Sequence, residues 1–136
     1  MRLLAIPVLL FSLSCSKGEY NQLRRLFADA AQLFRDYGRE LNNAATAEQA
    51  TVTMRDYNGR VEQLIARKEE VLRGYPELQD MKRLRQTCER LDEFQTFRAD
   101  FSDFYRGGDR IARKFGHDKA FQAESKRGRK LITRML

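Results

Sequence analysis

The residue of this chain with the clearest chemical role is Cys15, whose thiol follows a segment typical of protein export. Arg2 is followed by a nearly unbroken apolar run over residues 3–11, and serines at positions 12 and 14 enclose Leu13. One basic residue, an apolar stretch of this length and small residues before the cut are typical of a secretory signal peptide. The run is too short to span a bilayer, which takes about 20 apolar residues. We therefore predict a signal peptide at residues 1–14 and covalent lipid attachment at the Cys15 thiol.

The segment resembles the signal sequences of bacterial lipoproteins, in which the cysteine becomes the first mature residue and carries acyl chains such as palmitate. The residues before that cysteine usually read Leu, then Ala or Ser, then Gly or Ala, whereas this chain has Ser12 and Leu13 in the first two positions. The same residues also suit ordinary signal-peptidase cleavage, and an uncleaved anchor is a third alternative. The resemblance implies a lipid-anchored protein of the bacterial cell envelope that faces the periplasm or the exterior. Ser16 implies the outer membrane if the envelope is Gram-negative.

Residues that hold metals or cofactors are scarce. His117 is the only histidine, so neither a histidine-rich metal site nor a Cys–His nucleophile can be assembled, and we expect His117 in a helix connection. Met54, Met81 and Met135 fall on apolar helix faces, which leaves a haem-binding bundle with Met and His ligands as an alternative. No haem-attachment motif is present. We predict no metal site and no cofactor.

Candidate catalytic groups also have structural explanations. Cys88 shares an apolar seam with Leu84 and Leu91, which predicts a buried, unreactive thiol. It can pair with Cys15 only if Cys15 is not acylated. Adjacent carboxylates, as in Glu69-Glu70, diverge by about 100° on a helix and cannot share a substrate. Because nucleotide-binding and hydrolase motifs are also missing from the sequence, we predict no catalytic residue and no enzyme.

Positive charge gathers in the C-terminal quarter. Residues 15–104 carry 15 Lys and Arg against 16 Asp and Glu, a net −1, whereas residues 105–136 carry 10 against 3, a net +7. Such a cluster is either a solvated helix face or a contact surface for an anionic lipid or an acidic envelope protein. Nucleic acid is not expected, because the aromatic residues are not interleaved for base stacking. The predicted contact residues are Arg113, Lys114, Lys126, Arg127, Arg129 and Lys130.

The elements that position these residues are predicted to be helices. Apolar residues recur every three or four positions from residue 20 to residue 41, and a second helix starts at a capping box formed by Thr46 and Gln49. Gly74 is expected as its left-handed stop, and Pro76 as the start of a third helix. The pattern favours reading this helix through Gly107-Gly108 to about residue 116 over a break there, with Asp118 as the N-cap of a short, basic fourth helix.

The seam of the third helix is predicted to run through Leu78, Met81, Leu84, Cys88 and Leu91. It then continues through four phenylalanines, which we interpret as core and not as a ligand channel. The sequence predicts an all-α protein, an antiparallel three- to four-helix bundle. Its organisation is a signal peptide at residues 1–14, a lipidated tether at 15–19 and a bundle domain at 20–136 with a basic C-terminal helix.

The sequence of residues 44–78 is similar to that of a group of small uncharacterised bacterial lipoproteins. The similar parts are the helix start Ala-Thr-Ala-Glu-Gln-Ala and the helix junction Gly-Tyr-Pro-Glu-Leu. The resemblance implies a lipidated N-terminus before a compact helical domain, and it carries no catalytic residue. We therefore expect a non-enzymatic interaction or envelope-structural protein. The alternative is a periplasmic bundle that binds haem or lipid.

Overall fold

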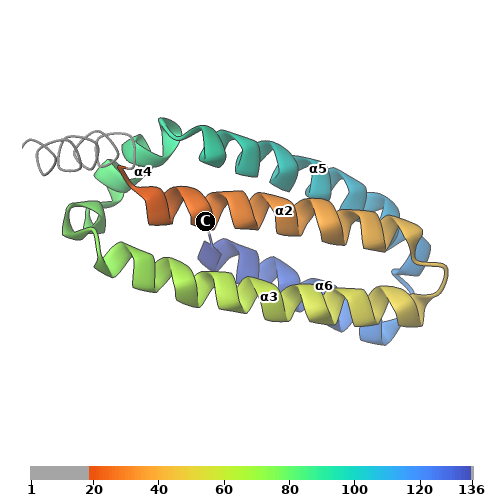
Figure 1. Ribbon diagram of the computed structural model, residues 1–136. Helices are drawn as coiled ribbons and strands as arrows, with labels where there is room; N and C mark the ends of the chain where they lie inside the picture. Colours follow the sequence, from red (N-terminus) through yellow and green to blue (C-terminus); the bar gives the residue numbers. More distant parts are fainter. Residues whose placement is uncertain (1–18, 136) are drawn as a thin grey trace, which may run out of the picture.

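The computed structural model describes residues 19–135, so the predicted signal peptide and Cys15 lie outside the described residues. Within them the chain forms helices and no strands, which confirms the predicted all-α class (Figure 1). The elements are α2 (Asn21–Asn43), α3 (Ala47–Arg73), a 3-10 helix η1 (Pro76–Gln79), α4 (Met81–Glu89), α5 (Asp92–Phe115) and α6 (Lys119–Met135).

The first two helices begin and end where the sequence pattern places them, with one exception. The capping box is confirmed: the Gln49 backbone N–H donates to Thr46 Oγ1 at 3.2 Å, and the Gln49 side-chain oxygen accepts from the Ala45 N–H at 2.9 Å. The expected left-handed stop at Gly74 is wrong, because Gly74 has a φ of −76°. The chain keeps its right-handed turn there and leads directly into η1.

The prediction of one third helix starting at Pro76 is wrong, because the segment is divided into η1, α4 and α5. Asp80 starts α4 by accepting a hydrogen bond from the Lys82 N–H at 2.9 Å. Leu91 then adopts an extended backbone, with φ −89° and ψ 125°, while its side chain is buried. Met81, predicted in the core seam, is 67 % exposed. A change of direction at each break removes Met81 from the face that a single helix would bury.

The prediction that the helix reads through Gly107-Gly108 is confirmed, since α5 continues to Phe115. The next turn is also as predicted, because Asp118 Oδ1 accepts a hydrogen bond from the Phe121 N–H at 2.9 Å. This cap satisfies a free backbone donor in the first turn of α6. The two glycines are tolerated because the apolar residues on both sides keep one register.

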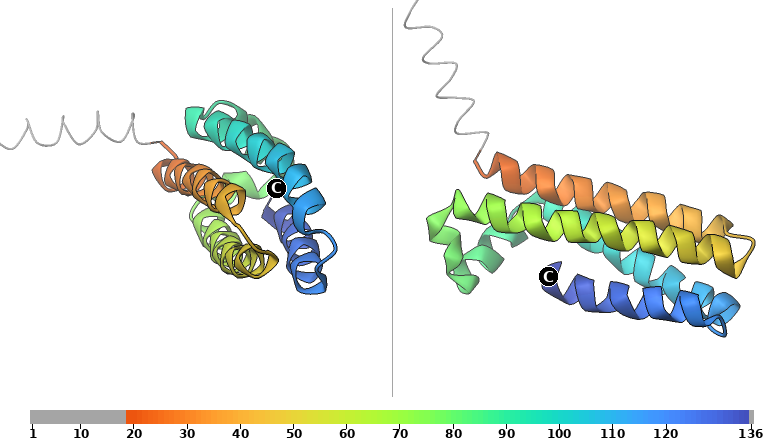
Figure 2. Two further views of the ribbon diagram at one scale, coloured as in Figure 1. Left: turned by 90° about the vertical axis from the view of Figure 1, so that its right-hand side faces the viewer. Right: turned by 90° about the horizontal axis from the view of Figure 1, so that it is seen from below.

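The four long helices lie side by side as two packed pairs. Helix α2 packs against α5 and α3 packs against α6, while α2 and α3 join the pairs (Figure 2). In contrast, α5 and α6 make few direct contacts with each other. The start of α2 lies at the same end as η1 and α4, and the α5–α6 turn lies at the opposite end, next to the α2–α3 loop (Figure 1).

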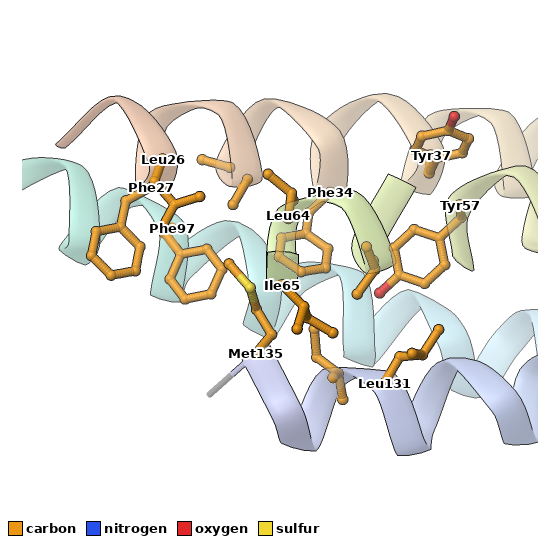
Figure 3. Close-up of a cluster of buried hydrophobic side chains, with 14 of the residues drawn as sticks. Leu26, Phe27, Phe34, Tyr37, Tyr57, Leu64, Ile65, Phe97, Leu131 and Met135 are labelled. Carbon is orange, nitrogen blue, oxygen red and sulfur yellow. The ribbon is translucent and has the colours of Figure 1, made fainter. Parts of the chain in front are cut away.

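Aromatic side chains fill the space between α2 and α5. Phe34 lies with its ring centroid 5.4 to 5.7 Å from those of Phe97, Phe101 and Phe104. Phe97 is 1 % exposed, and its neighbours in the ladder are half-buried. Figure 3 shows Phe34 and Phe97 among the other buried side chains of this core. Phe97 is therefore packed core, as predicted, whereas the other three phenylalanines of the ladder are half-buried and pack against the core. Fully burying one such side chain contributes about 1.5–3 kcal/mol.

Helix α6 approaches α3 closely at Gly128. A Cβ atom at this position would lie 2.8 Å from Asn58 Oδ1 and 3.3 Å from Met54 Cε. Asn58 is fully buried, and its Nδ2 donates to the Glu124 carbonyl oxygen and to Glu124 Oε2, each at 2.9 Å. Its Oδ1 has no hydrogen-bond partner within residues 19–135, and a glycine Cα–H is the group that faces it. The α3–α6 contact therefore depends on the missing side chain of Gly128.

We predict that Gly128→Ala lowers the free energy of unfolding by about 1–3 kcal/mol, because the added methyl overlaps Asn58 Oδ1. Gly59→Ala is the matched control. A Cβ at Gly59 meets nothing within 4 Å, so the better helix propensity of alanine is expected to stabilise by about 0.5–1 kcal/mol. Urea unfolding followed by circular dichroism measures both, and equal effects of the two variants would contradict the close approach.

Candidate functional site

The predicted contact residues are divided between two environments. Lys114 Nζ donates to the Ala44 carbonyl oxygen at 3.1 Å, which ties the end of α5 to the α2–α3 loop. Arg127 forms ion pairs with Glu62 and Glu124, so it helps hold α6 on α3. These two cations therefore serve internal contacts. The other four predicted residues are exposed and have no carboxylate partner in the described part of the chain, namely Arg113, Lys126, Arg129 and Lys130.

Further cations of α5 and α6 share this unpaired state. Together with the four just named they form a set of eight exposed side chains without a carboxylate within 4 Å among residues 19–135. We call this set the C-terminal basic surface, and the added members are Arg106, Arg110, Lys119 and Arg134. The charge count signalled these four, because they belong to the same basic quarter of the sequence.

Four arginines of α2 and α3 pair across helix contacts, whereas other exposed arginines of these helices, such as Arg25 and Arg39, have no carboxylate within 4 Å in the described chain. Arg24 of α2 pairs with Glu93 of α5 at 3.0 Å, and Arg35 of α2 pairs with Asp100 of α5 at 2.6 Å. The same holds for the contacts of α3 with its neighbours, where the pairs are Arg67 with Asp29 and Arg55 with Glu124. Such pairs align helices that already pack. The C-terminal basic surface has no such partner and keeps its charge toward solvent.

A groove runs between α5 and α6, where the two helices fail to pack. Its volume is about 150 Å³, and its wall is mostly apolar, with Met54, Phe104, Phe121 and Ile132 among the lining residues. Gly108 lines it from α5 and leaves open space, since a Cβ there would meet nothing within 4 Å. We call this feature the α5–α6 groove.

Polar groups line the same groove. Tyr57 of α3 is 2 % exposed and stacks on Phe104 with ring centroids 4.9 Å apart. Burial raises the pKa of the Tyr57 phenol above its ordinary value, and the nearby Tyr105 adds a smaller effect in the same direction. The phenol is therefore protonated throughout the physiological range. Tyr105 is 42 % exposed at the rim, and Arg129 lies on the α6 side. The groove thus combines an apolar wall with two phenols and a guanidinium.

Periodicity in the sequence does not predict this groove. The place of each lining residue on its own helix can be predicted from the apolar spacing. The gap between α5 and α6 cannot, because it depends on how the two helices diverge after the turn that joins them. The two adjacent glycines in α5 are the sequence feature that comes closest to indicating the groove, because Gly108 has no side chain to fill the space there.

Cys88 is buried, as predicted, and lies near the C-terminal end of α6. Burial raises the pKa of its thiol to about 11, an effect partly offset by Lys68. Burial likewise lowers the pKa of Lys68, whose Nζ donates to the Met135 carbonyl oxygen at 2.8 Å. A cation at the end of a helix satisfies free carbonyl groups and stabilises the helix dipole. This cluster therefore secures α6 and leaves the thiol neutral.

Residues considered for metal or haem binding are not brought together. His117 is exposed in the turn after α5, whereas Met54 lies at the wall of the groove and His117 does not line it. Within residues 19–135 no group of three or more His, Cys, Asp or Glu side chains is arranged to hold a metal ion. No helix in that range is long and apolar enough to cross a membrane.

We predict that native Cys88 reacts with iodoacetamide at pH 8 about 100-fold more slowly than in guanidinium, because its thiolate fraction is lower by that factor. The raised pKa of the Cys88 thiol also makes the stability of the fold depend on pH. The neutral thiol contributes stability that is fully present below pH 9.0, the ordinary thiol value, and is lost as the pH rises toward about 11. Alkylation followed by mass spectrometry measures the first effect, and equal rates in both states would show an accessible thiol.

Comparisons with known proteins assign this chain to no family. No protein-family model, curated protein or solved structure matches it. The function therefore has to be argued from the geometry of the chain itself.

Proposed function

We propose that this chain is a lipid-anchored, non-enzymatic protein of the bacterial cell envelope that binds an acidic envelope protein through its C-terminal basic surface. In this proposal residues 1–14 are a signal peptide, Cys15 carries the acyl chains, and residues 15–19 tether an antiparallel four-helix bundle. The single basic residue Arg2, the apolar run over residues 3–11 and the cysteine at position 15 support the anchor.

The observation that carries the binding role is the excess of unpaired positive charge in one part of the molecule. The eight cations of the C-terminal basic surface are exposed without a carboxylate within 4 Å in the described chain, and residues 105–136 carry a net charge of +7, whereas residues 15–104 carry −1. Unpaired like charges repel each other, which weakens a compact state. An acidic partner would relieve that repulsion, and it would also be drawn to the surface over distances set by the salt concentration.

The position of the tether favours a protein partner over lipid of the anchoring membrane. The tether joins the bundle where α2 begins, and five residues reach at most about 17 Å. Helix α2 has 23 residues and is therefore about 34 Å long, and the α5–α6 turn lies at its far end (Figure 1). In an upright bundle, Arg113 and Lys119 point away from the membrane. They would then be available to a partner that stands in the envelope.

We expect Cys15→Ala to move the protein from the membrane fraction to the soluble fraction. The reason is that several acyl chains, each methylene contributing about 0.8 kcal/mol, hold a protein on a bilayer that it does not span. Fractionation of the native host and the intact mass of the extracted protein measure this. Unchanged membrane association of the variant would contradict the anchor.

The binding role is tested with two triple variants that remove the same charge. Arg113→Gln, Lys126→Gln and Lys130→Gln together should weaken binding to labelled poly-glutamate about tenfold at low salt, since each exposed ion pair contributes about 0.2–1 kcal/mol. The control replaces three exposed cations of α4, with the changes Lys82→Gln, Arg83→Gln and Arg85→Gln. Fluorescence anisotropy gives the affinities. Equal losses in both variants would mean that net charge, and not this surface, attracts the polymer.

A further inference from the structure

The α5–α6 groove gives access to a tyrosine hydroxyl that bonds no other described residue. Tyr57 is 2 % exposed as a whole residue and lines the groove, and its hydroxyl is not among the buried atoms that lack a partner, so the oxygen reaches the open space of the groove. Figure 3 shows this hydroxyl directed away from α2, toward the side of α5 and α6. A tyrosine presents an apolar ring together with a hydroxyl that can donate and accept a hydrogen bond. A polar atom of a molecule in the groove can therefore bond this hydroxyl in place of water.

Two further polar groups, Tyr105 and Arg129, line the same groove as Tyr57. Helices α5 and α6 run in opposite directions from the turn around residue 117, so residues equally far from it lie opposite each other. Tyr105 and Arg129 are each 12 positions from that point, and both line the groove. Tyr105 also contributes to the raised phenol pKa of Tyr57, so these two side chains are near each other. Two phenol donors and a guanidinium together suit a carboxylate, which accepts hydrogen bonds only.

The charges around Arg129 determine which charge a ligand in the groove should carry. Lys126 and Lys130 flank Arg129 on α6, and no carboxylate in the described chain pairs with them. The one acidic residue in the groove wall, Asp109, is eight positions from residue 117 and lies opposite Ser125. It therefore stands about one helical turn from the level of Tyr105, closer to the α5–α6 turn. A negative head group is attracted at Arg129 and kept away from Asp109.

The rest of the groove accepts a short hydrocarbon. From the level of Arg129 toward the turn, the wall presents the apolar residues Gly108, Ala112 and Phe121 alongside the polar Asp109 and Ser125, and Met54 lines it from α3. A volume of about 150 Å³ is enough for roughly six carbon atoms, since an apolar cavity of this size holds benzene. Because the groove is open along one side, a somewhat longer chain can extend out of it.

We propose that the α5–α6 groove binds a fatty acid, with its carboxylate between Tyr57, Tyr105 and Arg129 and its hydrocarbon directed toward the α5–α6 turn. This site does not depend on the anchor at Cys15 or on the acidic partner. The ligand class follows from three features together: a phenol hydroxyl that is open to the groove, a guanidinium that lines the same groove and an apolar wall. A neutral or cationic molecule of the same length would lack the match at Arg129.

The test is calorimetric titration of the purified protein with octanoate, and with octanol as a neutral molecule of the same chain length. Octanoate should bind at one site, and octanol at least about tenfold more weakly. Tyr57→Phe and Arg129→Gln should each weaken octanoate binding about tenfold. Neither variant endangers the fold, because the Tyr57 hydroxyl and the Arg129 side chain bond no other described residue. Lys82→Gln removes an exposed charge of α4, a helix that does not line the groove, and should leave the affinity unchanged.

A second pair of variants locates the site. Gly108→Leu fills the open wall of the groove and should abolish octanoate binding, whereas Gly107→Leu, one residue along the same helix, does not line this groove and should retain it. Circular dichroism checks that both variants fold. Absence of saturable octanoate binding, equal affinity for octanoate and octanol, or retained binding in Gly108→Leu would each overturn the proposal. The poly-glutamate experiment keeps Arg129, so the two proposals fail independently.

Discussion

The phenylalanine contacts between α2 and α5 determine where the other helices can lie. Phe34 meets three rings of α5, and Phe104 in turn stacks on Tyr57 of α3, so one aromatic layer joins three helices. Because α5 directs its apolar side toward α2, the helix that follows must cover α3 instead. It reaches α3 closely through Gly128, whose missing side chain makes room for Asn58. The last two helices are consecutive in the chain yet share no seam, and the groove between them is the result.

Electrostatic interactions follow the same division. Ion pairs connect α2 with α5 and α3 with α6, the pairs of helices that already pack. Exposed pairs of this kind contribute little to stability, about 0–1 kcal/mol each, so their main effect is to fix the register of the helices. In the part of the chain that the structure describes, no ion pair joins α5 to α6. Of the basic residues of these two helices, Arg129 lines the groove between them, and the one acidic residue in the groove wall is Asp109.

Local patterns predicted the local structure, and the failures occurred where tertiary packing decides. The caps at Thr46 and Asp118 and the continuous register through Gly107 depend on neighbours within four residues, so they could be read from the sequence. The break at Leu91 could not, because the apolar spacing on both sides also fits a straight helix, and burial of Leu91 after a turn is a tertiary effect. The basic residues of the candidate site were visible as a charge excess. Their pairing was not, since Arg127 and Arg129 differ only in the helix that each one faces.

Helix α6 is attached to the rest of the molecule mainly through α3, with Lys68 bound to its last turn. Elements with one packed neighbour open at a lower free energy than the whole protein unfolds, and they do so as a unit. In this chain that unit is α6, which forms one side of the groove. When α6 detaches, its amide hydrogens exchange with solvent before those of α2 do. Any molecule held between α5 and α6 would slow that exchange, which makes hydrogen-exchange protection of a single helix a direct report of occupancy.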